Sequence, residues 1–209
     1  MIARHTMSII QLVQTANRAD QPLVCFLDLQ VEYVAEGRAL ALEAGTPWME
    51  NCRRLLALAR AERMSIAHFR QLRRGTVLNP ATGFANWIEE FRPRPSEMVF
   101  ERALPSCYAA EKFASVLDYI DHPIIVLAGL TGHGACLATV LDGFHRRHHF
   151  IYVSDASATP RLGSLDPGAS HACVTEIIGS YAEVGSTEKT IKWLGSLTMK
   201  TSLVGENVQ

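Results

Sequence analysis

Residues 123–159 read PIIVLAGLTGHGACLATVLDGFHRRHHFIYVSDASAT. An apolar run breaks into a turn of small residues, a helical segment follows, and a second apolar run closes the stretch. A strand that ends in glycines and leads straight into a helix places backbone N–H groups and the positive helix end at the mouth of a parallel sheet. We therefore expect the functional site near this turn.

Apolar runs and amphipathic segments alternate along the rest of the chain. Strands are predicted at residues 23–28, 65–69, 98–101, 124–128, 150–154 and 182–185. Helices are predicted at 48–63, 107–119, 135–147 and 169–181, and a last one, capped by Ser186 or Thr187, runs to about residue 197. This order predicts an α/β protein, a three-layer α/β/α sandwich whose central parallel sheet has about six strands in a Rossmann-like topology.

Composition indicates a single soluble domain over residues 1–209, with its core at about 20–197. The chain has 209 residues, 48% of them apolar and 20% charged, and a formal net charge of -1, so nucleic acid is not an expected partner. The apolar runs fall short of the roughly 20 residues that span a bilayer, and the N-terminus lacks a signal-peptide core. Five cysteines without a CxxC pair fit reduced thiols, so we expect a cytoplasmic protein.

Four polar residues stand where predicted strands end, and each has an ordinary structural interpretation beside a functional one. Asp28, inside FLDLQ, either caps a turn or is an acid with a shifted pKa. Arg102 is a surface arginine or a site cation, and His133 caps a helix, lines a pocket or is solvated. For Asp155, a bond to the following turn is favoured over a catalytic role.

Two further segments have distinctive composition. The insert at residues 73–95 is rich in loop residues and contains Phe84 and Trp87, which favours a lid or a wall of a neighbouring subunit's site. The cluster of His145, His148 and His149 lies between a helix and a strand with two arginines, and we predict a solvated surface turn there.

The order of the motifs resembles one family. FLDLQ, RLLALARAE, VFERALPSCY, GLTGHGACLATVLDGF, YVSDASAT and SHACVTEII follow one another as they do in the isochorismatase-like cysteine hydrolases, over about residues 20–197. The resemblance implies an isochorismatase-like α/β hydrolase domain that acts on a small molecule. It also implies a homodimer or a larger homo-oligomer.

In the cysteine-using members an aspartate, a lysine and a cysteine form the triad. Asp28 matches the aspartate and Gln30 its usual companion, whereas Arg102 stands at the lysine position. There an arginine could bind a carboxylate or steady Asp28, but it is a poor proton donor. Ala135 falls where the nucleophile would be and Cys136 comes one residue later, a step of about 100° on a helix. Cys136 should therefore point away from the site. Candidate substrate-binding residues are Gln30, Trp87, Tyr108, Thr131, His133 and Gly134.

Three functions stay open. The first is a cysteine-independent hydrolase of a small anionic metabolite in which Asp28 is the general acid or base, Arg102 holds the substrate and N–H groups of residues 134–136 stabilise developing charge. The second is an amidase-type enzyme with Cys136, or less favourably Cys107, as nucleophile. The third is a member without catalysis that binds a ligand or serves in assembly.

Two further expectations come from the family resemblance, one about a metal site and one about a cis peptide bond. Nicotinamidases of this family hold zinc in the loop after the second strand, but LRRGTVLNPATGFANWIEEF contains no histidine or aspartate, so neither a metal nor another cofactor is predicted. Family members often have a non-proline cis peptide before the nucleophile helix, and here that bond would join Leu130 to Thr131.

Overall fold

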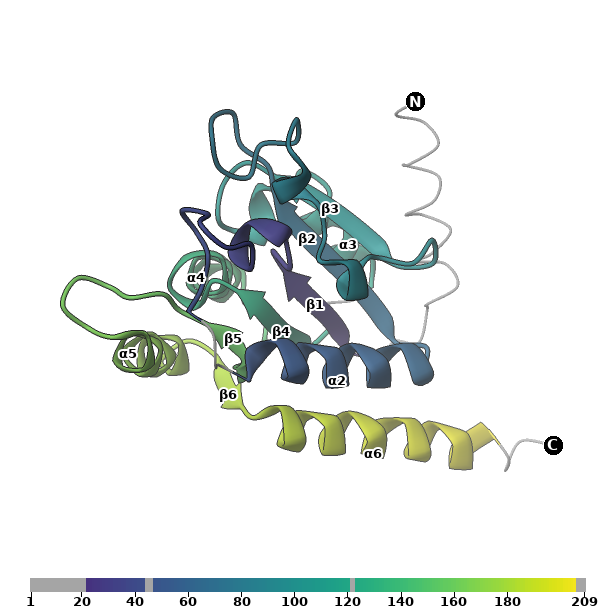
Figure 1. The fold of residues 1–209 in the computed structure, drawn as a ribbon. Coiled ribbons are helices and arrows are strands. Elements are labelled where there is room, and N and C mark those ends of the chain that lie inside the picture. Colours follow the sequence, from purple (N-terminus) through teal and green to yellow (C-terminus); the bar gives the residue numbers. More distant parts are fainter. Residues whose placement is uncertain (1–21, 44–46, 121–122, 206–209) are drawn as a thin grey trace.

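The computed structural model describes residues 22–43, 47–120 and 123–205, with side chains as far as residue 197. Six parallel strands form one sheet in the order β3-β2-β1-β4-β5-β6. Their bounds are β1 Leu23–Leu27, β2 Ser65–Gln71, β3 Met98–Arg102, β4 Ile125–Leu130, β5 Phe150–Ala158 and β6 Glu183–Gly185. The predicted parallel α/β fold is confirmed (Figure 1). The N-terminal residues used for the signal-peptide prediction lie outside the described residues.

Helices cover both faces of the sheet. On one face α2 (Trp48–Ala61) and α6 (Thr187–Gly205) lie side by side (Figure 1). The other face carries α3 (Phe113–Tyr119), α4 (Leu137–His145) and α5 (Pro167–Gly179). Alternate residues of β1 divide between the two cores: Leu23, Cys25 and Leu27 face α3 to α5, whereas Val24 and Phe26 face α2. Burial on both faces explains why the strands are continuous apolar runs.

The strand order reverses between β1 and β4, which is where α/β sheets bind ligands. These two strands pair in register, with Leu27 opposite Gly129. Gly129 has φ of +114°, and a Cβ atom there would lie 2.2 Å from the Leu27 carbonyl oxygen, so only glycine fits. Asp28, the residue after β1, has φ of +50°, a conformation that non-glycine residues seldom adopt and that often marks a functional position.

Two helix predictions were wrong at their start. The segment 107–119 is split into η4, a 3-10 turn at Cys107–Ala109, and α3, because the backbone is extended at Ala110, where φ is −80° and ψ is 112°. The segment 135–147 begins earlier, with the π-helical turn η5 at Gly132–Cys136. There the Thr131 carbonyl accepts from the N–H groups of Gly134 and Cys136 before α4 begins.

The end of the sheet also differs from expectation. β5 continues to Ala158, so Asp155 lies within the strand, and its carboxylate accepts from the Thr187 N–H and hydroxyl, both at 2.7 Å. The prediction that Asp155 bonds the turn after β5 was therefore wrong, because Asp155 anchors the start of α6. Ser186 caps that helix as predicted, with Oγ accepting from the Lys189 N–H at 3.4 Å. The helix extends to Gly205, beyond the expected end near residue 197.

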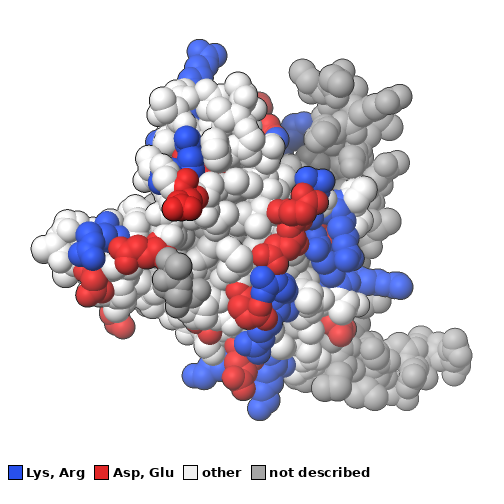
Figure 2. Space-filling model, viewed as in Figure 1, with Lys and Arg blue, Asp and Glu red and all other residues white. Residues whose placement is uncertain are grey.

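Charges of both signs are intermixed on the face that carries α2 and α6 (Figure 2). Several of them form ion pairs that join α2 to neighbouring segments, among them Arg53 with Glu90 and Arg60 with Glu97. Of the helices in the described residues, none combines the length and the apolar character needed to span a bilayer.

Candidate active site

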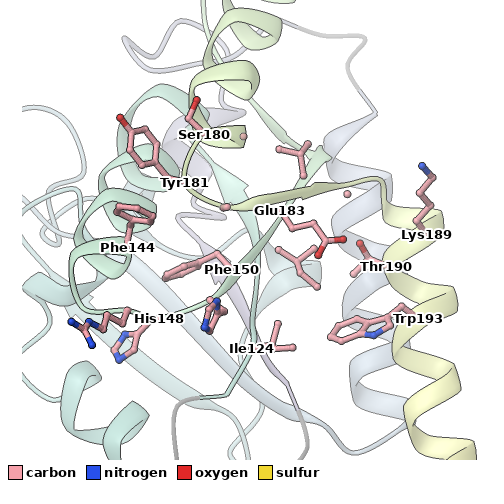
Figure 3. A pocket seen from close by; sticks show the side chains of 17 residues that line it. Ile124, Phe144, His148, Phe150, Ser180, Tyr181, Glu183, Lys189, Thr190 and Trp193 are labelled. Carbon is pink, nitrogen blue, oxygen red and sulfur yellow. The ribbon is translucent and has the colours of Figure 1, made fainter.

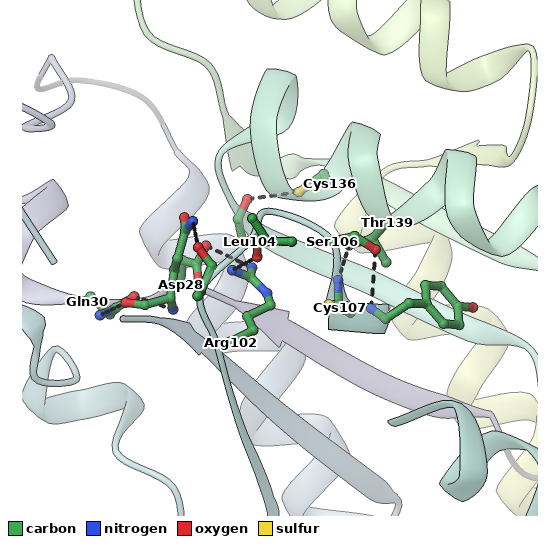
Figure 4. Close-up of polar contacts among 12 residues, drawn as sticks. Asp28, Gln30, Arg102, Leu104, Ser106, Cys107, Cys136 and Thr139 are labelled. Atoms are coloured by element: carbon green, nitrogen blue, oxygen red, sulfur yellow. Dashed lines mark hydrogen bonds and ion pairs between the residues drawn. The ribbon is translucent and has the colours of Figure 1, made fainter. Parts of the chain in front are cut away.

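Asp28 and Arg102 form a buried ion pair at the carboxyl ends of β1 and β3 (Figure 4). Arg102 Nη2 donates to Asp28 Oδ2 at 2.9 Å, and the two side chains are 0% and 1% exposed. Asp28 Oδ1 has no hydrogen-bond partner within the structure. One carboxylate oxygen is therefore held by Arg102, while the other is buried without a hydrogen-bond partner among the described residues.

The environment of Asp28 favours its protonated form. Burial removes water from the carboxylate and raises its pKa from 3.8 to about 6, although the adjacent Arg102 guanidinium acts in the opposite direction. A carboxyl group that titrates near pH 6 can both donate and accept a proton close to neutral pH. Asp28 thus has the properties of a general acid or base.

A cavity of about 250 Å³ opens above Asp28. Its lining residues lie at or after the carboxyl ends of β1 to β5: Asp28, Tyr33, Ala39, Leu40, Ala41, Gln71, Arg73, Leu78, Pro105, Thr131, His133, Gly134, Ala135 and Pro160. Asp28, Thr131, His133, Gly134 and Ala135 were predicted site residues, and the structure brings them together. Tyr33 and Arg73 were missed, because their loops show no periodicity that fixes where a side chain points.

The side chains that line the cavity include His133, Tyr33 and the cationic Arg73. Burial lowers the pKa of His133, so its imidazole is neutral at pH 7, and its Nδ1 has no hydrogen-bond partner in the structure. Burial likewise raises the pKa of the Tyr33 hydroxyl, which therefore stays protonated. Arg73 is exposed to solvent and is the only lysine or arginine among the lining residues.

Arg102 does not occupy the position expected of a substrate ligand. Its side chain has no exposed surface and is absent from the lining of the cavity. Besides Asp28, Nη1 donates to the Leu104 carbonyl at 3.2 Å. Of the two roles expected for Arg102, the observed contact is the one with the carboxylate of Asp28, and the side chain does not line the cavity in which a substrate anion would be held.

The thiols lie outside the cavity. Ala135 lines it, whereas Cys136 is fully buried and its Sγ contacts the Gly129 carbonyl oxygen at 3.6 Å (Figure 4). The predicted rotation of Cys136 away from position 135 is confirmed. Burial raises the pKa of the Cys136 thiol, and it raises that of Cys107 to about 11. Neither residue has the depressed pKa of an activated nucleophile.

The turn before α4 bears on two predictions, one about its N–H groups and one about a cis peptide bond. The N–H groups of Gly134 and Cys136 were expected to stabilise charge, but both donate to the Thr131 carbonyl at 3.1 Å. They are thus occupied within the π-helical turn. The predicted cis peptide bond between Leu130 and Thr131 is confirmed.

Three predicted substrate-binding residues lie elsewhere. The side-chain amide of Gln30 is fully buried and bonds the backbone of Gln71 and Ala85. Tyr108 bonds His148 at 2.6 Å on the α4 side of the sheet. Trp87 pairs with Gln30 in a short β-bridge and packs against His68. None of the three is among the residues that line the cavity.

A larger groove of about 1100 Å³ lies at the amino ends of β4 and β5, between α4, β6 and α6 (Figure 3). Phe144, Tyr181 and Val184 expose apolar surface there. His148 also lines the groove but is 8% exposed, so the prediction of a solvated turn was wrong for this residue, since Tyr108 packs on it. His145 and His149 are exposed, as predicted. The groove is at the end of these strands opposite to Asp28.

Within the parts of the chain that the structure describes, no three side chains of His, Cys, Asp or Glu come close enough to hold a metal ion. Among the groups that line the cavity above Asp28 are the carboxyl group of Asp28, the imidazole of His133 and the guanidinium of Arg73.

Comparison with known proteins gives consistent matches. A family model described as "Isochorismatase domain" matches residues 22–189. An uncharacterised isochorismatase family protein of Bacillus subtilis (strain 168), YddQ, is 25% identical over 174 residues, which are 79% of this chain and 96% of the relative. A cysteine hydrolase of Pseudomonas syringae pv. phaseolicola 1448A superposes with a TM-score of 0.76 at 20% identity, over 87% of this chain and 95% of that one. An isochorismatase of Pseudomonas putida KT2440 superposes with a TM-score of 0.74 at 24% identity, over 87% and 97%.

Proposed function

Because the chain belongs to the isochorismatase family, we propose that it is a hydrolase of a small anionic metabolite that uses Asp28 as its general acid or base and no cysteine nucleophile. The observation that carries this proposal is the composition of the cavity. Asp28 is the only carboxylic acid among its lining residues, and no thiol lines it. The position next to the turn, where a nucleophile would stand, is the methyl group of Ala135.

The chemistry follows from the two carboxylate oxygens. Arg102 holds Oδ2, so the proton transfer is assigned to Oδ1, the buried oxygen that has no hydrogen-bond partner among the described residues. Protonated Asp28 donates its proton to the atom that leaves, or to the carbon of a polarised double bond, and water adds to the resulting cation. A proton of that water then returns to the carboxylate, which restores the starting state. No covalent enzyme intermediate is needed, consistent with an alanine at position 135.

Arg73 supports an anionic substrate. It is exposed at the cavity, whereas Asp28 is buried in it, so a bound carboxylate would face Arg73 while the reacting group lies over Asp28. For Arg73→Ala we expect KM for the substrate to rise about tenfold, with kcat within about threefold of wild type, because one charge-assisted hydrogen bond is lost.

Arg74→Ala is the matched control for that experiment. Arg74 is adjacent, equally charged and also exposed, but it does not line the cavity above Asp28. Steady-state kinetics of both variants should therefore separate a specific contact from the general field of the loop. Equal effects of the two substitutions would contradict an anion contact at Arg73.

The first test is turnover of a panel that includes isochorismate, nicotinamide and N-carbamoyl compounds by wild type and Cys136→Ala. We expect the substrate that wild type cleaves to be cleaved by Cys136→Ala at a rate within about threefold, because the thiol is buried behind the turn. Loss of turnover in a folded Cys136→Ala protein would favour the amidase-type mechanism instead. No turnover of any compound would favour a ligand-binding or assembly role.

The proposal includes a cellular location and an oligomeric state. Four of its five free cysteines are buried, which suits a reducing compartment such as the cytoplasm. A homodimer or larger homo-oligomer is proposed from the family resemblance. Sedimentation or light scattering of the purified chain decides that point.

A further inference from the structure

Two loops meet over the cavity. The loop after β1, residues 29–43, contributes Tyr33, Ala39, Leu40 and Ala41 to the cavity wall. The loop after β2, residues 72–86, contributes Arg73 and Leu78. Apart from the 3-10 turns η1 (Val31–Tyr33) and η2 (Gly83–Ala85), these loops have no regular secondary structure. Individual backbone and side-chain contacts therefore fix their positions.

Near their start and end the loops are joined by backbone bonds. The Val31 N–H donates to the Asn86 carbonyl at 2.9 Å, and Gln30 forms a bridge with Trp87. Further along, the backbone bonds close within each loop: Leu42 N–H to the Tyr33 carbonyl and Arg73 N–H to the Leu78 carbonyl, both at 2.9 Å. These bonds shape each loop without tying one tip to the other.

Arg38 makes the connection at the tips. Its guanidinium donates to both carboxylate oxygens of Glu32, at 3.1 and 3.0 Å, inside the first loop. The same group crosses to the second loop, where Nη2 donates to the Thr76 carbonyl at 2.7 Å and the guanidinium carbon lies 4.1 Å from the centre of the Phe84 ring. The Arg38 guanidinium thus contacts the Glu32 carboxylate, the Thr76 carbonyl and the face of the Phe84 ring.

Burial makes this contact costly to lose. The Glu32 side chain is 0% exposed and that of Arg38 is 25% exposed. A carboxylate without water requires its cation, and removing one partner of such a pair is strongly unfavourable. The segment that carries Ala39, Leu40 and Ala41 follows Arg38 directly, so any displacement of Arg38 moves the cavity wall.

We infer that Arg38 is a positioning residue that ties the two loops together over the cavity and so sets the shape of the substrate site. The effect on the loops stands independently of any reaction. Only the consequence for substrate binding rests on the proposed function.

Amide hydrogen exchange tests the inference without a substrate. In Arg38→Met we expect the amides of Leu42 and Arg73, one in each loop, to exchange at least tenfold faster than in wild type, while the amides of β1 and β4 keep their rates. Arg38→Lys retains the charge but not the planar fork, and we expect an intermediate acceleration in the same two loops.

Arg70→Met is the matched control. Arg70 also pairs with a carboxylate, Glu101, and also lies near an aromatic ring, Trp87 at 5.7 Å, but it makes no contact with the first loop in the structure. We expect wild-type exchange at Leu42 in this variant. Unchanged exchange of both loops in Arg38→Met and Arg38→Lys, or equal acceleration throughout the sheet in both, would overturn the inference.

Steady-state kinetics test whether Arg38 affects substrate binding. With whichever panel compound wild type cleaves, we expect Arg38→Lys to raise KM at least fivefold and to leave kcat within about threefold, since Asp28 and Arg102 are not touched by Arg38. An unchanged KM despite loosened loops would overturn the role in shaping the site. If wild type cleaves no compound, the proposed function fails on that result, whereas the exchange data still decide whether Arg38 joins the loops.

Discussion

Asp28→Asn is expected to lower kcat/KM by about 10²- to 10⁴-fold, the usual range for removal of a general acid or base. Asparagine has the shape of aspartate and can still accept a hydrogen bond from Arg102, but its amide neither releases nor takes up a proton near neutral pH. Steady-state rates of wild type and variant on the cleaved panel compound measure the effect.

The matched control is Asp142→Asn, which changes an exposed aspartate on α4 and should leave kcat/KM unaltered. The circular dichroism spectrum of Asp28→Asn should confirm that the sheet is intact. Retention of more than about a tenth of the wild-type rate in a folded Asp28→Asn protein would rule out Asp28 as the essential proton donor or acceptor.

The pH dependence distinguishes acid from base. As a general acid Asp28 must be protonated, and with a pKa of about 6 its protonated fraction falls tenfold per pH unit above that value. We therefore expect kcat/KM to decline between pH 6.5 and 8.5 with a slope approaching −1 in a logarithmic plot. As a general base Asp28 must be ionised, so kcat/KM would instead rise up to about pH 6 and stay level above it.

Stability should change with pH in the same direction. The pKa of Asp28 is raised on folding, from 3.8 to about 6, so the folded chain binds more protons than the unfolded chain between these values. Its contribution to the free energy of unfolding is complete below about pH 4 and is lost as pH rises through about 6. Asp28→Asn should remove this component from a comparison of urea unfolding at pH 4.5 and 7.

Arg102→Leu is expected to lower the free energy of unfolding by about 3–5 kcal/mol at pH 7.5, because it leaves Asp28 as a buried carboxyl group without its cation. The remaining carboxyl can avoid the charge by staying protonated, so the loss should shrink at pH 5. Urea denaturation at the two pH values measures both quantities.

Two further variants sharpen this experiment. Arg53→Leu removes an arginine whose ion pairs with Glu50 and Glu90 are exposed, and it should cost about 1 kcal/mol or less. In the double variant Asp28→Asn/Arg102→Leu no charge remains at either of these two buried positions, so it should recover part of the stability that Arg102→Leu loses. A cost below about 1 kcal/mol for Arg102→Leu itself would contradict the importance of the pair.

The fold was predictable because its strands are nearly continuous apolar runs. β1 and β6 were located within one residue at each end, and β2, β3 and β4 begin within one residue of expectation. The segment 107–119 was misjudged because the backbone is extended at Ala110 (φ −80°, ψ 112°), which separates η4 from α3. Alanine favours a helix, so the local pattern did not indicate a break at this position.

The site was predictable where it follows strand ends and unpredictable where it depends on loops. Asp28 and Ala135 lie at the cavity because β1 and β4 place them there. For Arg102 the sequence left two roles open, a substrate ligand or a partner of Asp28, and the structure shows the contact with Asp28. Tyr33 and Arg73 reach the site through loops whose course depends on contacts such as that of Arg38 with Thr76, 38 residues apart.

The pairing of Leu27 with Gly129 has a consequence for how activity relates to folding. The proposed acid follows the first of these residues and the turn with Ala135 follows the second, so the two halves of the site adjoin only once the central ladder has closed. A nascent or partly unfolded chain in which these strands are apart has no assembled site at all. Catalytic turnover would then report the completed sheet, and recovery of activity during refolding should lag behind helix formation and coincide with closure of that ladder.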